Sequence, residues 1–282
     1  MAQTDAVIIT VVMAVLNSRV TLRRCIASIL AQTAGGVELV VIDGGSTDGS
    51  VEILQSYGAR IAYWISEPDR GVYNALNKAL ARARGQWIYI IGADDYLWSR
   101  DVFERAIPHL ERAYPPARVV YGEEAFVNER GEILSILGMP WHKVRRGFFA
   151  YMSLPHQAVF HHRSLFAEHG GFDETFRVAG DYEMLLRELK RGEAVFVPGL
   201  IVAAYQFGGG SSTPRNNLQV LREWRRAQRL NGYRLPSLRW VLAVTEVSLR
   251  ILLCRTLGET RGRRMFDRLR LAFGKAPFWT RI

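Results

Sequence analysis

The sequence has little cysteine, no basic leader at its start and no apolar run long enough to cross a bilayer. Two cysteines, Cys25 and Cys254, cannot build a disulfide framework and fit a reducing compartment. Residues 1–5 lack the basic residues of a signal peptide, and the apolar run that follows is rich in β-branched residues, as in a strand. Residues 238–254 are apolar, but they are short for a span and carry charges. These absences argue against a secreted domain held by disulfides and predict a cytoplasmic protein.

Positive charge is concentrated in the last quarter of the 282 residues. Residues 215–282 hold 16 Lys and Arg against 4 Asp and Glu, a net charge of +12, whereas residues 1–214 carry a net charge of −2. Hydrophobic residues make up 49% of the chain, which is enough for a large core and argues against disorder. We therefore expect one domain over residues 1–214 and a basic C-terminal region over residues 215–282, whose partner is an acidic surface.

Strand and helix signals alternate through the first hundred residues. Apolar runs predict strands over residues 6–13, 37–43, 61–66 and 87–91. Segments with helical periodicity predict helices over residues 21–32, 48–57, 72–84 and 101–114. This alternation predicts an α/β fold, with a Rossmann-like, mostly parallel sheet and flanking helices.

The pattern changes after Pro115-Pro116. Strands are expected over residues 119–127 and 132–137, around a hairpin loop at 128–131, and shorter strands at Phe160, 195–197 and 201–207. One helix is expected over residues 182–191, a flexible loop over 208–212, and three final helices over 215–231, 237–256 and 260–273.

Two adjacent acids, Asp94 and Asp95, follow the buried strand 87–91. Ligands bind at the carboxyl ends of strands in open α/β sheets. Adjacent carboxylates suit Mg²⁺ or Mn²⁺, which takes few carboxylates together with substrate phosphates. A solvated turn is the alternative interpretation.

The three preceding strands also end in polar residues. Asn17 follows the first strand, Asp43 ends the second, and Asp69-Arg70 follow the third. Asp43 could bind a nucleobase or ribose, or it could form an Asx turn that caps the next helix. Because parallel strands end at one edge of the sheet, these residues should gather there.

Asp181 lies at the start of a predicted helix, in Gly180-Asp181-Tyr182-Glu183. It is either a helix N-cap or a general base near the metal site. His156, His161 and His162 have irregular spacing across a strand, which does not fit a zinc site.

Taken in order, these motifs resemble the family 2 glycosyltransferases with the GT-A fold, of the type that builds bacterial surface polysaccharides. The resemblance covers residues 6–213. It rests on the strand ending at Asn17, Asp43-Gly44-Gly45-Ser46-Thr47-Asp48-Gly49, Asp69-Arg70-Gly71 with Asn77, Gly92-Ala93-Asp94-Asp95, His156-Gln157, Gly171-Phe172-Asp173-Glu174 and Gly180-Asp181.

The resemblance implies a role for each matching position. The nucleotide sugar would be bound by Ala14, Val15, Asn17, Asp43, Asp69, Arg70, Asn77 and Asp94, with Asp43 on the nucleobase and Asp94 toward the ribose or donor sugar. Asp95 would coordinate the metal on the diphosphate, Asp181 would be the catalytic base, and His156 and Asp173 would lie near the acceptor or the diphosphate. Two positions depart from the pattern. Ala93 replaces the first acid of Asp-x-Asp, and Gly180 stands where many members have Glu.

These residues predict a metal-dependent, inverting transfer of a sugar from a nucleotide-diphosphate donor to a hydroxyl, with a lipid-linked glycan as acceptor. A nucleotidyltransferase is a rival, but Val15-Leu16-Asn17-Ser18 is not a Gly-rich, basic phosphate loop. A catalytically silent nucleotide-sugar sensor or membrane assembly protein is the second rival, and the presence of both Asp95 and Asp181 argues against it.

The basic C-terminal region predicts peripheral binding to the inner face of the cytoplasmic membrane. In its last helix Met265, Phe266, Leu269, Ala272 and Phe273 share one face, and arginines lie elsewhere. A basic helix with an apolar face is typical of interfacial membrane binding. A helix pair packed on the domain is the alternative. No nucleic-acid partner is expected, because no recognised binding module is present.

Overall fold

The computed structural model describes residues 6–128, 131–206, 214–272 and 274. The loop expected over residues 208–212 and Phe273 lie outside the described residues, as do two residues of the predicted hairpin loop.

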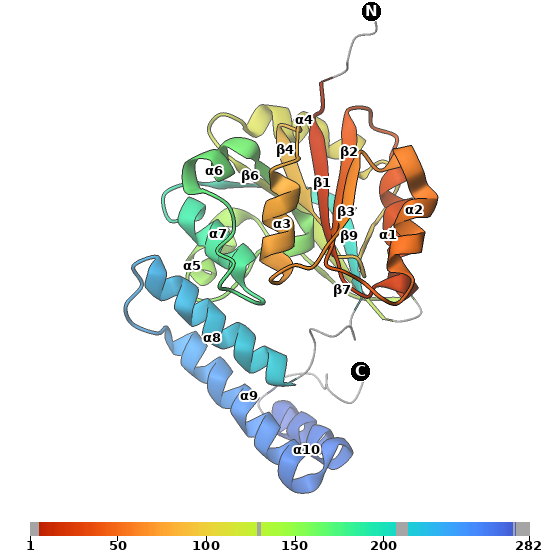
Figure 1. The fold of residues 1–282 in the computed structure, drawn as a ribbon. Coiled ribbons are helices and arrows are strands. Elements are labelled where there is room, and N and C mark those ends of the chain that lie inside the picture. Colours follow the sequence, from red (N-terminus) through yellow and green to blue (C-terminus); the bar gives the residue numbers. More distant parts are fainter. Residues whose placement is uncertain (1–5, 129–130, 207–213, 273, 275–282) are drawn as a thin grey trace, which may run out of the picture.

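Four parallel strands end at one edge of the central sheet, which we call the carboxyl edge. They are β1 (Ile9–Val15), β2 (Val37–Asp43), β3 (Tyr63–Ser66) and β4 (Trp87–Ile90), in the order β3-β2-β1-β4. All three neighbouring pairs are parallel. β1 runs from the N-terminus at the top of Figure 1 to the bottom, so the carboxyl edge faces downward there. This order matches one half of a doubly wound fold, as the alternation predicted.

The sheet becomes mixed beyond β4. Its other strands are β5 (Tyr96–Leu97), β6 (Val119–Val127), β7 (Ile133–Leu137), β8 (Val159–His162) and β9 (Ala194–Gln206). β8 is antiparallel to both β4 and β6, so β6 runs in the same direction as β1–β4. β9 is parallel to β6, whereas β5 and β7 pair antiparallel with β9 and β6. The α/β fold is therefore confirmed, with its parallel pairs confined to β1–β4 and to β6 with β9.

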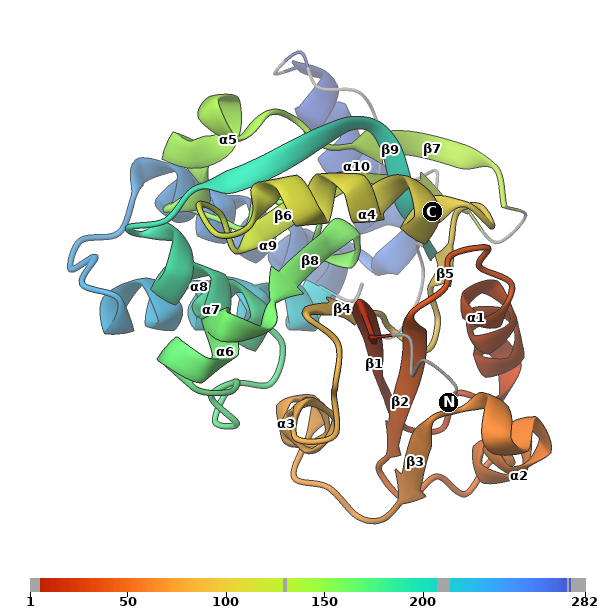
Figure 2. The same cartoon turned by 90° about the horizontal axis from the view of Figure 1, so that it is seen from above.

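Helices cover both faces of the sheet, and the alternation of side chains along β1 explains why. Val11 and Met13 lie in the hydrophobic core on one face and Val12 in the core on the other. The first core takes α1 (Arg19–Leu30), α2 (Ser50–Tyr57) and α4 (Val102–Ala113), and the second takes α3 (Val72–Leu80), α5 (Trp141–Phe148), α6 (Arg163–His169) and α7 (Gly180–Leu189). Figure 2 shows α1 and α2 on one side of β1–β3 and α3 on the other.

Four elements differ from the sequence prediction, and one of them is the two-residue strand β5, which was not predicted. The two strands expected over residues 195–197 and 201–207 are one strand, β9, whose register against β6 shifts between Tyr121 and Glu123. Pro198-Gly199 lies at this shift, where a missing N–H and a turn signal suggested a break. The helices α5 and α6 were not predicted. Trp141, Val144 and Phe148 of α5 are buried with helical spacing, but the segment is short and follows Pro140.

The C-terminal helices leave the domain as a hairpin below the carboxyl edge (Figure 1). They are α8 (Pro214–Leu230), α9 (Leu238–Leu257) and α10 (Glu259–Ala272). α8 packs on the domain through buried Ala227 and through Gln228, whose Nε2 donates to the Ala150 carbonyl at 2.9 Å. None of the described helices is long and apolar enough to span a membrane.

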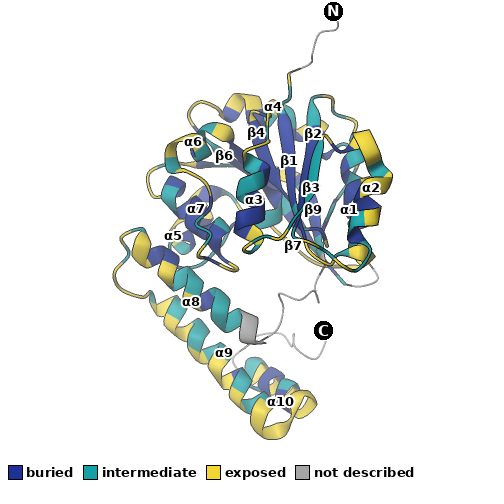
Figure 3. Cartoon of the chain, in the orientation of Figure 1, coloured by how far each residue is buried: buried dark blue, intermediate teal, exposed yellow. Residues whose placement is uncertain are grey.

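α9 and α10 are more exposed than α8 (Figure 3). Phe266 is buried between them, but Met265, predicted on the same face, is 42% exposed. The predicted apolar face of α10 is therefore divided, because only part of it contacts α9. Along α9 the exposed apolar residues include Leu238, Leu242 and Leu252.

Candidate active site

The loops after β1 and β2 are tied together at the carboxyl edge. Asn17 is the one described non-glycine residue with positive φ (50°), a conformation that Asn tolerates. Its N–H donates to Ser46 Oγ at 2.8 Å and its Oδ1 accepts from the Thr47 N–H at 3.0 Å. Val15 accepts the Gly44 N–H at 2.8 Å, and half-buried Ala14 packs in the second core. The residues predicted along the nucleotide therefore do gather at one edge.

Asp43 is fully buried, and its carboxylate accepts hydrogen bonds from the loop that follows it. Oδ2 accepts the N–H groups of Gly45 and Ser46 at 3.1 and 2.9 Å and the Ser66 hydroxyl at 2.6 Å, and Oδ1 accepts the Ser46 hydroxyl at 2.5 Å. This is the turn-forming interpretation left open by the sequence. The turn also shapes the loop that a nucleobase would meet, so the two interpretations are compatible.

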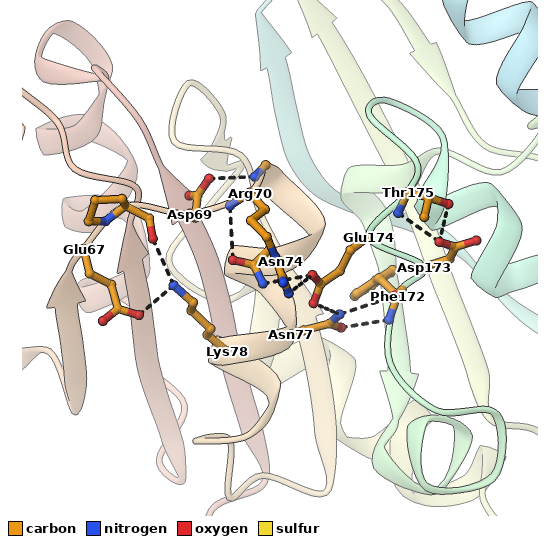
Figure 4. Close-up of polar contacts among 12 residues, drawn as sticks. Glu67, Asp69, Arg70, Asn74, Asn77, Lys78, Phe172, Asp173, Glu174 and Thr175 are labelled. Atoms are coloured by element: carbon orange, nitrogen blue, oxygen red, sulfur yellow. Dashed lines mark hydrogen bonds and ion pairs between the residues drawn. The ribbon is translucent and has the colours of Figure 1, made fainter.

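Arg70 and Asn77 belong to a polar network between α3 and the loop before α7 (Figure 4). Glu174 is its centre: it accepts from Arg70 Nη2 at 2.6 Å, Asn74 Nδ2 at 3.0 Å and Asn77 Nδ2 at 3.1 Å. Asn77 also exchanges two hydrogen bonds with the backbone of Phe172. Asn77 therefore positions the 171–174 loop, while Asp69 accepts the Gly71 N–H at the start of α3.

The carboxylates of Asp94 and Asp95 converge above Gly92. A Cβ on Gly92 would lie 2.8 Å from both Asp94 Oδ1 and Asp95 Oδ2, so only glycine leaves this space clear. Asp94 is exposed and Asp95 is buried at 1% exposure. Burial raises the pKa of the Cys25 thiol well above its usual value, and Asp95 and Asp94 raise it further. Burial, and after it the charge of Asp95, also raises the pKa of the Tyr89 hydroxyl well above its usual value. Both neighbours therefore stay neutral.

Asp181 sits between a tyrosine and a histidine. The Tyr73 hydroxyl donates to Asp181 Oδ1 at 3.2 Å, and His156 Nε2 lies 3.5 Å from Oδ2. Burial, together with Asp181, raises the pKa of Tyr73 well above its usual value, so Tyr73 stays protonated as a donor. The Tyr89 hydroxyl donates to the Gln157 carbonyl at 2.7 Å, which joins the Asp95 strand to the η2 turn (His156–Ala158).

Gly180 is explained by the same tyrosine. A Cβ at position 180 would lie 2.8–2.9 Å from three ring carbons of Tyr73. A Glu side chain there, as in many family members, would displace this ring and with it the hydrogen bond to Asp181. Glycine at position 180, where many family members have Glu, thus leaves room for the Tyr73 ring, whose hydroxyl donates to Asp181.

The N-cap interpretation of Asp181 is wrong. The N-cap of α7 is Ala179, and Asp181 lies within the first turn, where an acid interacts favourably with the helix dipole. Glu223 of α8 instead accepts the N–H groups of Arg177, Val178 and Ala179, the three residues that lead into α7, at 2.8–3.1 Å. α8 therefore fixes the helix that carries Asp181.

Asp173 and the remaining histidines have structural surroundings. Asp173 Oδ1 accepts the N–H and hydroxyl of Thr175, and Oδ2 lies 3.6 Å from Arg226 Nη2. Burial, with His156 nearby, lowers the pKa of His161 to about 3, so it is neutral. The described residues contain no cluster of three or more His, Cys, Asp or Glu placed to hold a metal ion.

The sequence prediction missed Tyr73, Glu174 and Glu223. Each acts through a partner that lies 44 or more residues away in the chain. Only Glu174 had a local signal, since it follows Asp173 in a motif already noted.

The sequence of this chain is similar to those of known proteins. The sequence model of Glycosyl transferase family 2 matches residues 10–166. A PGL/p-HBAD biosynthesis glycosyltransferase of Mycobacterium tuberculosis is 30% identical over 212 residues, which cover 72% of this chain and 79% of the relative.

Two solved structures share the fold. Residues 1–349 of Staphylococcus aureus TarS, in complex with UDP-GlcNAc, have a TM-score of 0.63 at 17% identity, and the match covers 86% of this chain and 72% of that fragment. The mannosyltransferase PcManGT from Pyrobaculum calidifontis, in complex with GDP-Man and Mn²⁺, has a TM-score of 0.62 at 18% identity, covering 95% of this chain and 76% of PcManGT. These likenesses confirm the GT-A fold.

Proposed function

The chain belongs to glycosyl transferase family 2, and from that premise we propose that it is an inverting, metal-dependent enzyme of bacterial surface polysaccharide synthesis. It would move a sugar from a nucleoside-diphosphate donor to a hydroxyl of a lipid-linked glycan. The observation that carries the proposal is Asp181, held by Tyr73 beside His156, whose turn is joined by the Tyr89–Gln157 hydrogen bond to the strand that precedes Asp94 and Asp95.

Asp181 has the surroundings of a general base. Its carboxylate accepts one hydrogen bond from the neutral Tyr73 hydroxyl and is partly exposed, so an acceptor hydroxyl can reach it. As the acceptor oxygen bonds to the anomeric carbon, Asp181 takes its proton and the bonding electrons of the donor leave with the diphosphate. Direct attack inverts the anomeric carbon, and no enzyme carboxylate is needed as nucleophile. His156 is placed to orient Asp181 or to contact the acceptor.

The donor would lie along the four strand ends. Asp43 and the Asn17 turn would meet the nucleobase, and Asp69 and Asp94 would meet the ribose and sugar. Arg70 and Asn77 are drawn into the Glu174 network, so we assign them to positioning the loop that closes this side.

The residues fit Mg²⁺ or Mn²⁺. The convergence of Asp94 and Asp95 on the space above Gly92 offers few carboxylates, which suits an ion that completes its shell with diphosphate oxygens. Asp95 would hold the ion, and its charge would stabilise the leaving diphosphate. PcManGT, which shares the fold, was solved with Mn²⁺ and GDP-Man, and this supports the proposal.

We assign the acceptor to a membrane and the enzyme to the inner face of the cytoplasmic membrane. The support is the exposed apolar residues of α9 and α10 among the arginines of a region with net charge +12. Because α8 packs on the domain and holds the segment before α7, we place the membrane-associating part in α9 and α10 rather than in all of residues 215–282.

Thermal shift with a panel of nucleotide sugars, with and without Mn²⁺, identifies the donor. Transfer and donor hydrolysis are then measured for the wild type and for Asp95→Asn, which should lose the metal-dependent part of donor affinity while keeping the fold. A wild type that binds the donor but neither transfers nor hydrolyses it would favour the sensor alternative. Unchanged metal-dependent affinity in Asp95→Asn would remove the metal assignment.

A further inference from the structure

The hairpin of β6 and β7 carries an apolar surface that the proposed function does not use. Ile133, Leu134, Ile136 and Leu137 of β7 are 45–50% exposed, and Met139 is 51% exposed. Apolar residues scattered singly on a surface are ordinary, but a cluster of exposed apolar side chains on one hairpin marks an interaction site. We call these five residues the β7 surface.

Both faces of β7 are exposed. Successive side chains of a strand point to opposite faces, so Ile136 and Leu137 lie on opposite faces of β7, and a register shift separates them from Ile133, which pairs with Val127. All five β7 residues are exposed, and no described element covers either face. A protein partner would cover one face of such a strand, whereas the interfacial layer of a bilayer surrounds a projecting hairpin on both faces.

The charge next to the β7 surface suits an anionic bilayer. Residues 133–149 contain Lys143, Arg145 and Arg146 and no acidic residue. Lys143 and Arg146 are exposed on α5 and form no ion pair among the described residues, while Arg145 pairs with Glu193. Figure 2 shows α5 and β7 on the same flank of the sheet, beyond β9 and toward opposite ends of it. Apolar side chains beside basic ones are typical of interfacial binding.

The hairpin is also at the edge that carries the site. β6 runs in the same direction as β1–β4, and its last residues, Glu124–Val127, pair with β7. The turn between them therefore lies toward the carboxyl edge. Figure 1 shows β7 at this lower edge, on the side where α9 and α10 project.

We propose that the β7 surface, with Lys143 and Arg146, is a second contact with an anionic bilayer, separate from α9 and α10. Two separated contacts fix the tilt of the domain, so the carboxyl edge faces the membrane and an acceptor hydroxyl is presented to Asp181. The inference rests on the proposed function only for its membrane-borne acceptor. A second copy of the chain is disfavoured as occupant, because five residues are far fewer than the roughly 20–30 per side of a stable interface.

The test is sedimentation of the full chain with vesicles of phosphatidylcholine alone or mixed with phosphatidylglycerol. Leu134→Thr with Ile136→Thr places β-branched residues, which favour a strand, at both positions and should weaken binding to both vesicles, by about fivefold or more. Lys143→Gln with Arg146→Gln should weaken binding to the anionic vesicles alone, by about fivefold per charge.

Two controls and one parallel measurement make each outcome decisive. Ser135→Thr on the same strand and Arg60→Gln, at the η1 turn (Gly58–Arg60) before β3 and so at the opposite edge, should bind as the wild type does. Unchanged binding by the Thr and Gln double variants would overturn the proposal and leave the C-terminal helices as the sole contact. A concentration-dependent dimer that Leu134→Thr with Ile136→Thr abolishes would overturn it in favour of a second copy.

The same variants separate this proposal from the proposed function. Donor binding and transfer to an acceptor without a lipid should stay at the wild-type level in all of them. If the wild type binds vesicles through the β7 surface but transfers no sugar, the proposed function fails and the membrane contact stands. If it transfers sugar but does not bind vesicles, the proposed function stands and the membrane contact fails.

Discussion

The donor side of the carboxyl edge, residues 6–95, and the base side, residues 119–231, hold their carboxylates in different ways. Asp43 is held by the loop that follows it and by Ser66, all within 23 residues along the chain. Asp181 is held by Tyr73, 108 residues away, and the segment that leads into its helix is held by Glu223 of α8. The donor side is therefore built from local turns, whereas the base side exists only when distant elements have docked.

Replacing the base should produce the largest effect. Asp181→Asn keeps the shape of the side chain but cannot take a proton, so turnover should fall by about 10²–10⁴-fold with donor affinity nearly unchanged. Steady-state transfer and calorimetry of the donor measure the two quantities. Asp173→Asn is the matched control and should retain most activity. If the two variants exchange these results, Asp173 is the base and the comparison of the two sides is wrong.

The buried carboxyl of Glu124, on the base side, should make the stability of the protein depend on pH. Burial raises the pKa of Glu124, 3% exposed, from 4.5 to about 8. The Glu124 carboxyl ionises near pH 4.5 in the unfolded chain but only near pH 8 in the folded chain. The stability of the folded protein therefore falls as the pH rises from about 4.5 to about 8. Glu124→Gln should therefore stabilise the protein at pH 8 by about 1–4 kcal/mol and change little at pH 4. Thermal unfolding at both pH values tests this, and an equal shift at both would contradict the assignment.

The loss of the Glu223 carboxylate, which holds the segment before α7, should lower both the stability of the protein and its turnover. Glu223→Gln removes a charged acceptor from three N–H groups and should cost about 1–2 kcal/mol in the free energy of unfolding. Turnover should fall a few-fold without a change in donor affinity, since only the base helix is loosened. Glu259→Gln is the control, because its carboxylate forms an exposed pair with Arg263 worth less than about 0.5 kcal/mol. Equal losses of unfolding free energy in Glu223→Gln and Glu259→Gln would show that the Glu223 hydrogen bonds contribute no more than an exposed ion pair.

The smallest effect expected is that of the Tyr73 hydroxyl. Tyr73→Phe keeps the ring that packs on Gly180 and removes one hydrogen bond, worth about 1 kcal/mol, so turnover should fall roughly fivefold. Donor affinity should not change, because the lost contact is on the base side. A weaker donor affinity with normal turnover would show that Tyr73 acts on the donor rather than on Asp181.

The sequence located most of the fold and most of the edge. Periodicity predicted β1–β4 and the helices between them, and strand ends then predicted Asn17, Asp43, Asp69 and the Asp94-Asp95 pair at one edge. It could not reveal that Asn77 and Arg70 are occupied by Glu174, because that network joins α3 to a loop nearly a hundred residues later. Short elements such as α5 also escaped, since one turn or two of helix gives little periodic signal.

The contact between Tyr73 and Gly180 has a consequence for how this sequence can change over generations. The ring lies where any side chain at position 180 would begin, so neither position can drift alone. A larger residue at 180 becomes tolerable only after position 73 has lost its ring, and an aromatic residue at 73 can be gained only opposite glycine. We expect related sequences to fall into two groups, one with glycine before the base and tyrosine in α3, and one with neither.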